Sequence, residues 1–169
     1  GRQVLECPLL EKDGHYEMDF DRFAQVAEEG KVLLFSSPHN PVGRVWSREE
    51  LEKLSAICLE KGVLVLSDEI HFDLILGERP HTVFATLSEA AAQNCVICTA
   101  PSKTFNLAGL QTANIIIPNK KLREKLLAVR NRLGIHGCNM LGYQACETAY
   151  RECEDWLEQL LAVLRENRA

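Results

Sequence analysis

Short runs of consecutive apolar residues alternate along this chain with longer segments in which apolar residues recur every three or four positions. The short runs lie at 32–35, 63–66, 95–99 and 112–117. Each has the length of a buried β-strand, whereas the longer segments show the period of an amphipathic helix. Strands that alternate with helices are typical of a mostly parallel sheet covered by crossover helices. The pattern therefore predicts an α/β fold.

Polar and glycine residues mark where these elements end. Ser47 and Glu50 have the spacing of a capping box at the start of a helix, and Gly62 stands where that helix would stop. Nearer the beginning of the chain, Asp13-Gly14 predicts a turn, and a helix is expected over about 20–28. The apolar strand pattern at 63–66 begins directly after Gly62. We therefore expect the helix between Ser47 and Gly62 to be the crossover that connects the strand at 32–35 with the strand at 63–66.

The last third of the chain has helical periodicity. Apolar residues share one face from Leu122 to Leu133, and two further helices are expected at about 138–151 and 154–167. No repeat or low-complexity linker divides the chain. We expect residues 1–150 to form part of one large domain, and residues 151–169 to form a helix that leads toward a second, smaller domain.

Composition excludes several classes of function. The 169 residues are 46% hydrophobic with a net charge of −5, and their charges are interspersed, so neither nucleic acid nor an anionic membrane is an expected partner. No segment reaches the roughly 18 apolar residues of a membrane span, and the first residues lack the pattern of a signal peptide. We therefore expect a cytoplasmic protein.

The seven cysteines do not suggest a disulfide framework or a metal site. Their number is odd, and most lie within apolar runs, as reduced core thiols do. Cys95 and Cys98 match a C-x-x-C spacing, but within a strand these positions point to opposite faces. We expect them to pack in the interior rather than to bind metal, because zinc needs two more ligands.

Candidate chemistry lies just after the predicted strands. Asn40, Asp68, His71 and Lys103 each follow one of them, and ligands bind at the carboxyl ends of strands in an open parallel sheet. A lysine can form a Schiff base with an aldehyde, and a carboxylate can keep a pyridine nitrogen protonated. Lys103 and Asp68 together predict a site for pyridoxal 5'-phosphate.

Three ordered motifs carry a resemblance to a known family. They are the runs Asn40-Pro41-Val42-Gly43-Arg44-Val45-Trp46, Ser67-Asp68-Glu69-Ile70-His71 and Ser102-Lys103-Thr104-Phe105-Asn106-Leu107-Ala108-Gly109-Leu110-Gln111. The chain resembles the large domain of fold-type I pyridoxal phosphate enzymes of the aminotransferase class I/II superfamily. It is most similar to their MalY and PatB type of cystathionine beta-lyase, also described as cysteine-S-conjugate beta-lyase.

The resemblance implies a role for each matched residue. Lys103 would hold the cofactor as a Schiff base and, once released by substrate, remove the Cα proton. Asp68 would pair with the pyridinium nitrogen, and Asn40 would donate to the phenolic oxygen of the ring. Without the resemblance, a lone lysine such as Lys103 is usually a solvated charge, a lone aspartate such as Asp68 is usually a helix cap, and Asn40 could merely shape a turn. Pro41 and Gly43 would fix the loop of Asn40, through a cis bond before Pro41 if one is present.

The remaining candidates concern the phenolic oxygen and the phosphate. His71 would bond the same ring oxygen or assist proton transfer near the leaving sulfur, with a purely structural histidine as the alternative. Ser102 is a candidate phosphate donor and Thr99 a weaker one. Many aminotransferases of this fold place a serine and an arginine on the phosphate where this chain has Ala100 and Gln111. The common phosphate clamp is therefore incomplete here.

The resemblance also implies the overall reaction and the assembly. A carbon–sulfur beta-lyase would convert cystathionine or another cysteine conjugate to a thiol, pyruvate and ammonia. The alternatives are transamination of a small amino-acid substrate and a truncated, non-catalytic binding or regulatory module. Enzymes of this type pair as homodimers, and their complete chains carry a phosphate loop, a ring-stacking aromatic residue and a carboxylate-binding arginine that we do not find here. We expect this chain to be the central portion of a longer protein.

Overall fold

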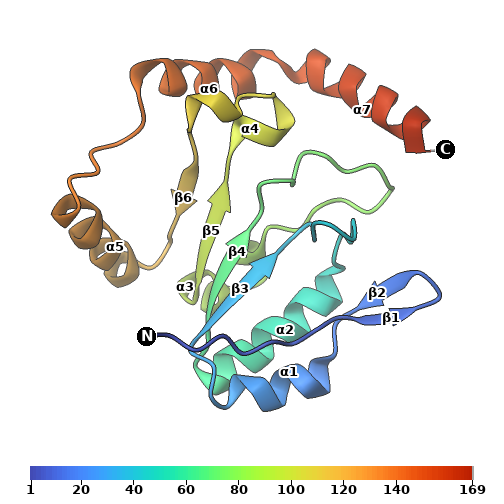
Figure 1. Ribbon diagram of the computed structural model, residues 1–169, viewed down its shortest axis with the longest axis vertical. Helices are drawn as coiled ribbons and strands as arrows, with labels where there is room; N and C mark the ends of the chain where they lie inside the picture. Colours follow the sequence, from blue (N-terminus) through green and yellow to red (C-terminus); the bar gives the residue numbers. More distant parts are fainter. Residues whose placement is uncertain (169) are drawn as a thin grey trace.

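A four-stranded sheet and a separate two-stranded hairpin organise the computed structural model, which describes residues 1–168 (Figure 1). The strands are β1 (Leu10–Lys12), β2 (His15–Glu17), β3 (Val32–Ser36), β4 (Leu64–Asp68), β5 (Cys95–Thr99) and β6 (Asn114–Ile116). The α-helices are α1 (Phe20–Ala27), α2 (Arg48–Lys61), α3 (Glu89–Gln93), α4 (Pro101–Thr104), α5 (Lys120–Arg132), α6 (Met140–Glu152) and α7 (Glu154–Arg168). Two short 3-10 helices are η1 (Phe84–Thr86) and η2 (Ala108–Leu110).

The four-stranded sheet has the order β3-β4-β5-β6. The pairs β3/β4 and β4/β5 are parallel, and their register aligns Ser36 with Asp68 and Asp68 with Cys98. This confirms the expected α/β fold with a mostly parallel sheet. The fourth strand is antiparallel to β5 and shorter than expected. Only α4 and η2 lie between β5 and β6, and they stay at the carboxyl edge, so the chain re-enters the sheet from that edge (Figure 1).

Helix α2 has the ends that its sequence predicts. The Ser47 side chain accepts a hydrogen bond from the Glu50 N–H, and the Glu50 carboxylate accepts one from the Ser47 N–H, which completes the capping box. At the other end Gly62 has φ 66°, a left-handed conformation that glycine adopts without strain. Leu51, Leu54 and Cys58 are buried along one face, as expected. This helix makes the crossover between β3 and β4.

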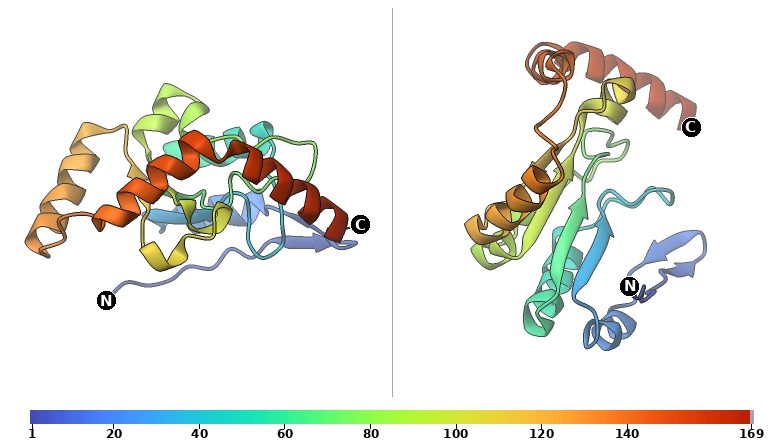
Figure 2. Two further views of the ribbon diagram at one scale, coloured as in Figure 1. Left: turned by 90° about the horizontal axis from the view of Figure 1, so that it is seen from above. Right: turned by 60° about the vertical axis from the view of Figure 1, so that its left-hand side comes forward.

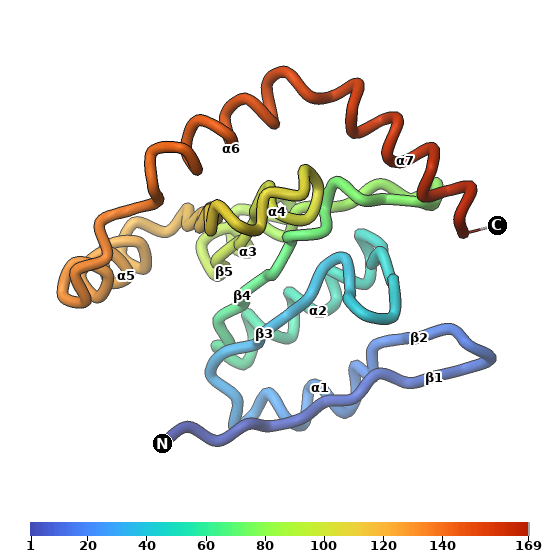
Figure 3. Tube along the Cα trace, turned by 45° about the horizontal axis from the view of Figure 1, so that its top comes forward, coloured from blue at the N-terminus to red at the C-terminus, as the bar shows by residue number. Residues whose placement is uncertain are grey.

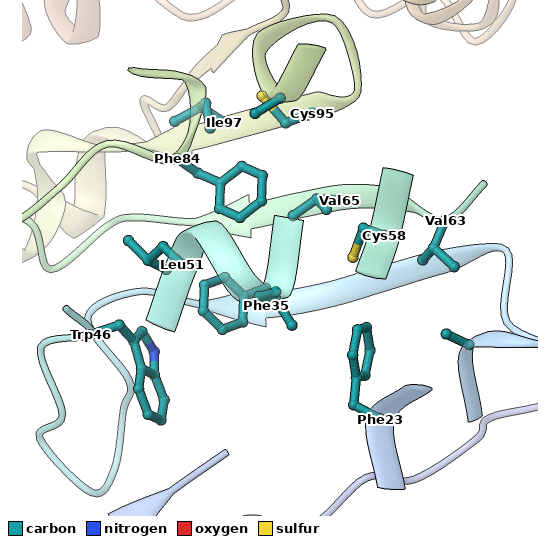
Figure 4. Close-up of a cluster of buried hydrophobic side chains, with 13 residues drawn as sticks. Phe23, Phe35, Trp46, Leu51, Cys58, Val63, Val65, Phe84, Cys95 and Ile97 are labelled. Carbon is teal, nitrogen blue, oxygen red and sulfur yellow. The ribbon is translucent and has the colours of Figure 1, made fainter. Parts of the chain in front are cut away.

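The core lies between the sheet and the helices α1 and α2 (Figure 4). Phe35 stacks on Trp46 with ring centroids 6.1 Å apart and meets the edge of Phe84 at 6.3 Å. Trp46 is 1% exposed, and its indole N–H donates to the Ser36 carbonyl at 2.9 Å. A buried aromatic ring of this size contributes on the order of 2 to 3 kcal/mol to stability. The core therefore fixes the loop that leaves β3.

The other face of the sheet is open. In β3, Leu34 is 78% exposed and Val32 is 49% exposed, whereas Phe35 between the sheet and α2 is buried. Alternation along a strand sends successive side chains to opposite faces, so the exposed residues define the uncovered side. We call this side, with Val32, Leu34 and Ile115 on it, the open face, and the side packed on α1 and α2 the covered face.

The last three helices lie around the sheet rather than within its core. Helix α5 lies beside β6 at the edge of the sheet (Figure 2), and its apolar residues Val129 and Leu133 are 48% and 68% exposed, the latter just past the helix end. Helices α6 and α7 run end to end over the carboxyl edge, above α4 (Figure 3). Within residues 1–168, no helix is both long and apolar enough to cross a membrane.

Two features of the first thirty residues differ from the pattern seen in the sequence. The turn at Asp13 and Gly14 is present, with φ values of 52° and 76°, but it connects a β-hairpin whose strands were not expected. Helix α1 ends at Ala27, one residue before the expected end, and buries Phe23 and Ala27. The hairpin strands are only three residues long, which is too short for a periodic signal.

Candidate active site at the carboxyl edge of the sheet

The sequence candidates follow three neighbouring strands. Asn40 lies in the loop after β3, Asp68 is the last residue of β4, and Lys103 lies in α4 just after β5. We had expected Asp68 immediately after its strand; its pairing with Ser36 and Cys98 extends β4 to include it. Because β3, β4 and β5 are parallel neighbours, all three residues lie at one edge of the sheet, with α4 above it (Figure 1).

Two carboxylates that are adjacent in the chain face opposite sides of the sheet. Asp68 is exposed, and its Oδ1 accepts a hydrogen bond from the Ile70 N–H at 3.2 Å. Glu69 is 1% exposed, and its Oε1 accepts hydrogen bonds from the Ser67 hydroxyl at 2.8 Å and the Phe84 N–H at 3.0 Å. Asp68 is therefore available to a ligand, and Glu69 is committed to the interior.

Glu69 and its partner His81 are the buried polar pair that sequence reasoning missed. The His81 Nε2 lies 2.7 Å from the Glu69 Oε2, and their side chains are 7% and 1% exposed. Glu69 lies within the motif Ser67–His71, and strand alternation about the exposed Asp68 predicts that its side chain faces the buried side of the sheet. No local signal pointed to His81, because it comes from a loop twelve residues later.

Lys103 is presented by a single helical turn. Pro101 occupies the first turn of α4, where its missing N–H costs nothing, and the Phe105 N–H donates back to its carbonyl at 2.9 Å. Lys103 is exposed, whereas the next residue, Thr104, is 0% exposed. The Thr104 hydroxyl donates to Asp73 Oδ2 at 2.8 Å. Burial raises the pKa of Asp73, an effect that this hydrogen bond opposes.

The two phosphate candidates flank this turn. Ser102 is partly buried within α4, and Thr99 is the partly buried last residue of β5. The Thr99 Oγ1 accepts a hydrogen bond from the Asn114 amide at 3.3 Å, which leaves its own hydroxyl proton available to an acceptor. Both hydroxyls therefore lie at the same strand end as Lys103.

A cavity of about 900 Å³ opens beside this edge. Its wall includes Asn40 and His71 but, within residues 1–168, none of the other four candidates. The structure thus brings Asn40 and His71 together around one hollow and leaves Asp68 and Lys103 outside it, on the strand ends. His71 is partly buried, and its carbonyl accepts the Leu74 N–H at 3.0 Å, which fixes the turn that carries it.

Arginines in the same cavity wall were not among the sequence candidates. Arg44 pairs with Glu50 at 2.5 Å, contacts His15, and lies over the Trp46 ring at 4.7 Å from its centroid. The Arg79 guanidinium lies 3.9 Å from the same Glu50 carboxylate. Glu50 therefore pairs closely with Arg44, whereas Arg79 is 54% exposed and only loosely associated with the same carboxylate.

Two of the seven cysteines, Cys58 and Cys95, are buried, and the other five are partly buried. All seven are free, and Cys95 is buried on the covered face whereas Cys98, three residues later, is partly buried. Burial raises the pKa of Cys58 to about 12 and that of Cys95 to about 11. No group of three or more metal-binding side chains gathers in the part of the chain that the structure describes.

Comparison with known proteins identifies a family. The family of class I and II aminotransferases matches residues 1–169. Cystathionine beta-lyase PatB from Bacillus subtilis is 48% identical over 169 residues, and the match covers 99% of this chain and 44% of that protein. The chain thus spans less than half the length of this curated relative.

Solved structures show the same fold. Cystalysin from Treponema denticola, whose crystal structure contains pyridoxal 5'-phosphate, superposes with a TM-score of 0.92 and 46% identity over 98% of this chain and 43% of that one. The pyridoxal phosphate-bound C-S lyase from Staphylococcus hominis superposes with a TM-score of 0.85 and 36% identity, over 95% of this chain and 40% of that one. The arrangement of strands and helices seen here therefore corresponds to less than half of each of those longer chains.

Proposed function

The chain belongs to the aminotransferase class I and II family, and from this premise we propose that the whole protein is a pyridoxal phosphate-dependent carbon–sulfur beta-lyase. One observation carries the proposal: Asn40, Asp68 and Lys103 lie at the carboxyl ends of three adjacent strands, in the order that the motifs predict. The similarity to a cystathionine beta-lyase and to C-S lyases supports this choice of reaction.

The residues at this edge fit the cofactor in the chemistry of their donors. The exposed Lys103 offers an amine for the aldehyde, and the exposed Asp68 offers a carboxylate for the ring nitrogen. Asn40 offers a neutral donor for the phenolic oxygen. Ser102 and Thr99 offer hydroxyls for the phosphate, and Thr99 keeps its proton free because it already accepts from Asn114.

Each residue then has a defined task. When bound, pyridoxal phosphate supplies an electron sink for the bond broken at Cα. Lys103 holds the cofactor and, after displacement by the substrate amine, accepts the Cα proton at its Nζ. Asp68 keeps a proton on the ring nitrogen through a charge-assisted hydrogen bond. We propose that His71, which lines the same cavity as Asn40, bonds the phenolic oxygen of the ring or delivers a proton to the departing sulfur.

The substrate class that we propose is a cysteine thioether such as cystathionine. Loss of the Cα proton and of the Cβ sulfur releases a thiol, and hydrolysis of the remaining enamine gives pyruvate and ammonia. Transamination is the second candidate, because the family includes aminotransferases and because Lys103 and Asp68 would serve both reactions equally up to removal of the Cα proton. The presence of His71 favours the lyase, because a histidine can donate a proton to a sulfur leaving group.

Product analysis separates these two functions. The whole protein, supplied with pyridoxal phosphate and cystathionine, should release pyruvate and thiol without any added keto acid. A matched Lys103→Ala variant should release neither. Turnover that requires an added keto acid, and converts it to the corresponding amino acid, would instead establish the aminotransferase.

We further propose that residues 1–150 belong to the cofactor-binding large domain and that residues 151–169 lead toward another domain. The break between α6 and α7 at Cys153 lies just after this boundary, which itself falls within the last turn of α6. We also propose a homodimer in the cytoplasm. Leu34, on the open face, is 78% exposed, which supports burial of this face by further protein. The free cysteines support a reducing compartment. Sedimentation of the whole protein at micromolar concentration tests the assembly.

A further inference from the structure

Helix α4, which carries Lys103, and the loop that carries His71 are joined by one polar contact. The Thr104 hydroxyl donates to Asp73 Oδ2 at 2.8 Å, and the two residues are 31 positions apart in the chain. Thr104 directly follows Lys103, and Asp73 lies two positions after His71. Lys103 is exposed while Thr104 is 0% exposed, so the contact is in the interior and leaves the lysine free.

The loop that carries Asp73 is fixed at its root. Glu69, at its start, accepts a hydrogen bond from the Phe84 N–H at 3.0 Å, and its other oxygen lies 2.7 Å from His81 Nε2. Both ends of the segment 70–83 are therefore attached to one buried carboxylate. Because both of its ends are held, the segment keeps Asp73 in a fixed position relative to Thr104.

Aromatic side chains reinforce the same junction from outside. Phe72, next to Asp73, stacks on Tyr150 with centroids 6.4 Å apart, and Phe105, next to Thr104, meets the edge of Tyr150 at 5.4 Å. Tyr150 belongs to α6, which passes above α4 (Figure 3). Burial and the neighbouring Asp73 raise the pKa of Tyr150, which keeps it neutral. One tyrosine thus contacts both segments.

From these contacts we propose that Asp73 is a positioning residue: through its hydrogen bond with Thr104 it fixes the turn that presents Lys103 relative to the loop that carries His71. The role rests on the proposed function of Lys103. Asp73 touches neither substrate nor cofactor in this role. Asp73 acts through Thr104. Because the Thr104 side chain is buried, the backbone of the neighbouring Lys103 can adopt only a restricted set of positions.

The setting of Asp73 is consistent with this role. Burial raises the pKa of its carboxyl, which means that the charged form is disfavoured where it lies, and the Thr104 hydroxyl offsets part of that cost. A neutral side chain would lose less solvation free energy on burial at this position. A carboxylate accepts a shorter, stronger hydrogen bond than an amide, and so it holds the turn more tightly.

Paired variants in the whole protein with pyridoxal phosphate test the contact from both sides. Thr104→Val removes the donor at nearly constant volume, and Asp73→Ala removes the acceptor, whereas Thr104→Ser and Asp73→Asn keep a donor and an acceptor. We expect each disruptive variant to lower kcat on the order of ten- to a hundredfold with little change in KM, because small displacements of a reacting group have effects of this size. The conservative variants should restore most of kcat.

Hydrogen exchange gives a readout that does not depend on turnover. Thr104→Val should speed amide exchange in residues 70–74, and Asp73→Ala should speed it in residues 102–107, each across the contact. Unchanged exchange in the opposite segment, or equal loss of kcat in Asp73→Asn and Asp73→Ala, would overturn the proposal. If Thr104→Val fails to fold, Asp73→Ala decides, because Asp73 is only partly buried. If the unaltered protein binds no cofactor, the proposed function fails, while reciprocal exchange still tests the contact.

Discussion

Asp68 and Glu69 are neighbours in the chain with the same charge, yet the structure uses them in opposite ways. Asp68 is exposed with one hydrogen bond to its own loop, while Glu69 is 1% exposed and bonded to Ser67, His81 and Phe84. Strand alternation separates them. The last residue of β4 is thus a group that is available for chemistry, and the residue after it is a group that holds the next loop in place.

The same contrast extends to the whole sheet. On the covered face Trp46 and Leu51 are 1% and 0% exposed, whereas Leu34 on the open face is 78% exposed. Stability of this chain therefore comes from one side of the sheet, while the cofactor candidates lie at its carboxyl edge. Substitutions on the two sides should affect different properties, which the following experiments measure.

The largest effect is expected at Lys103. Lys103→Ala should lower the activity of the whole protein on the order of a thousandfold or more, because both cofactor attachment and proton removal are lost. The midpoint of thermal unfolding should hardly move, because Lys103 is exposed. Steady-state assays and calorimetry on the same preparation check both. A large loss of stability would show that Lys103 is a structural residue.

The two carboxylates should differ in stability. Glu69→Ala leaves His81 and the Phe84 N–H without their buried partner, and we expect a loss of about 3 to 5 kcal/mol in the free energy of unfolding. Asp68→Ala is the matched control, with an expected change of about 0.5 kcal/mol or less and with loss of cofactor affinity. Urea titrations and cofactor titrations measure the two properties. Equal stability losses would contradict the separation of roles.

Much of this arrangement could be predicted from the sequence, for physical reasons. The four strands of the larger sheet, the capping box at Ser47 and Glu50, and the order of Asn40, Asp68 and Lys103 all follow from local periodicity and spacing. The buried pair of Glu69 with His81 and the contact of Asp73 with Thr104 could not be predicted. Both depend on how a loop folds back on the sheet, and no pattern within one segment encodes such a contact.

Other features lay between these extremes. Strand β6 is antiparallel to β5 because the connection through η2 stays at the carboxyl edge of the sheet. The apolar pattern at 112–117 is the same for either strand direction, so it could not predict this. The hairpin of β1 and β2 is too short to show alternation, although its turn was evident. The roles of Lys103 and the other site residues remain predictions that the proposed variants test.

Leucines on the two faces offer a smaller, purely structural contrast. Leu51→Ala should lower the free energy of unfolding by about 2 to 5 kcal/mol, because it opens a cavity against the covered face. Leu34→Ala, measured in the same 169-residue chain, should change it by about 0.5 kcal/mol or less. Chemical denaturation of both variants measures the difference. Comparable losses would mean that the open face is packed in solution.

The smallest effects should appear in the cysteines of β5. Burial raises the pKa of Cys95 to about 11, and it raises that of Cys98 less strongly. Thiol labelling at pH 8 should therefore modify Cys98 before Cys95, since only the thiolate reacts. Faster labelling of Cys95 would reverse the assignment of the two faces.

Cys58, on the covered face, adds a dependence on pH. Its pKa rises in the folded state from 9.0 to about 12, so its neutral thiol stabilises the fold fully below pH 9. That contribution is constant between pH 6 and 8, where it produces no pH dependence, and it is lost as the pH rises from 9 toward 12. Unfolding midpoints across this range, with Cys58→Ala as the control, should fall more steeply in the unaltered chain.

The central claim is that Lys103 holds the cofactor at the carboxyl edge of the sheet, and peptide mapping tests it most directly. The whole protein is incubated with pyridoxal phosphate, reduced with borohydride to fix any lysine linkage, digested, and examined by mass spectrometry. The account predicts a single modified lysine, Lys103, whose modification is lost in Lys103→Ala and weakened in Asp68→Ala. Modification spread over several surface lysines, with Lys103 unmodified, would contradict it.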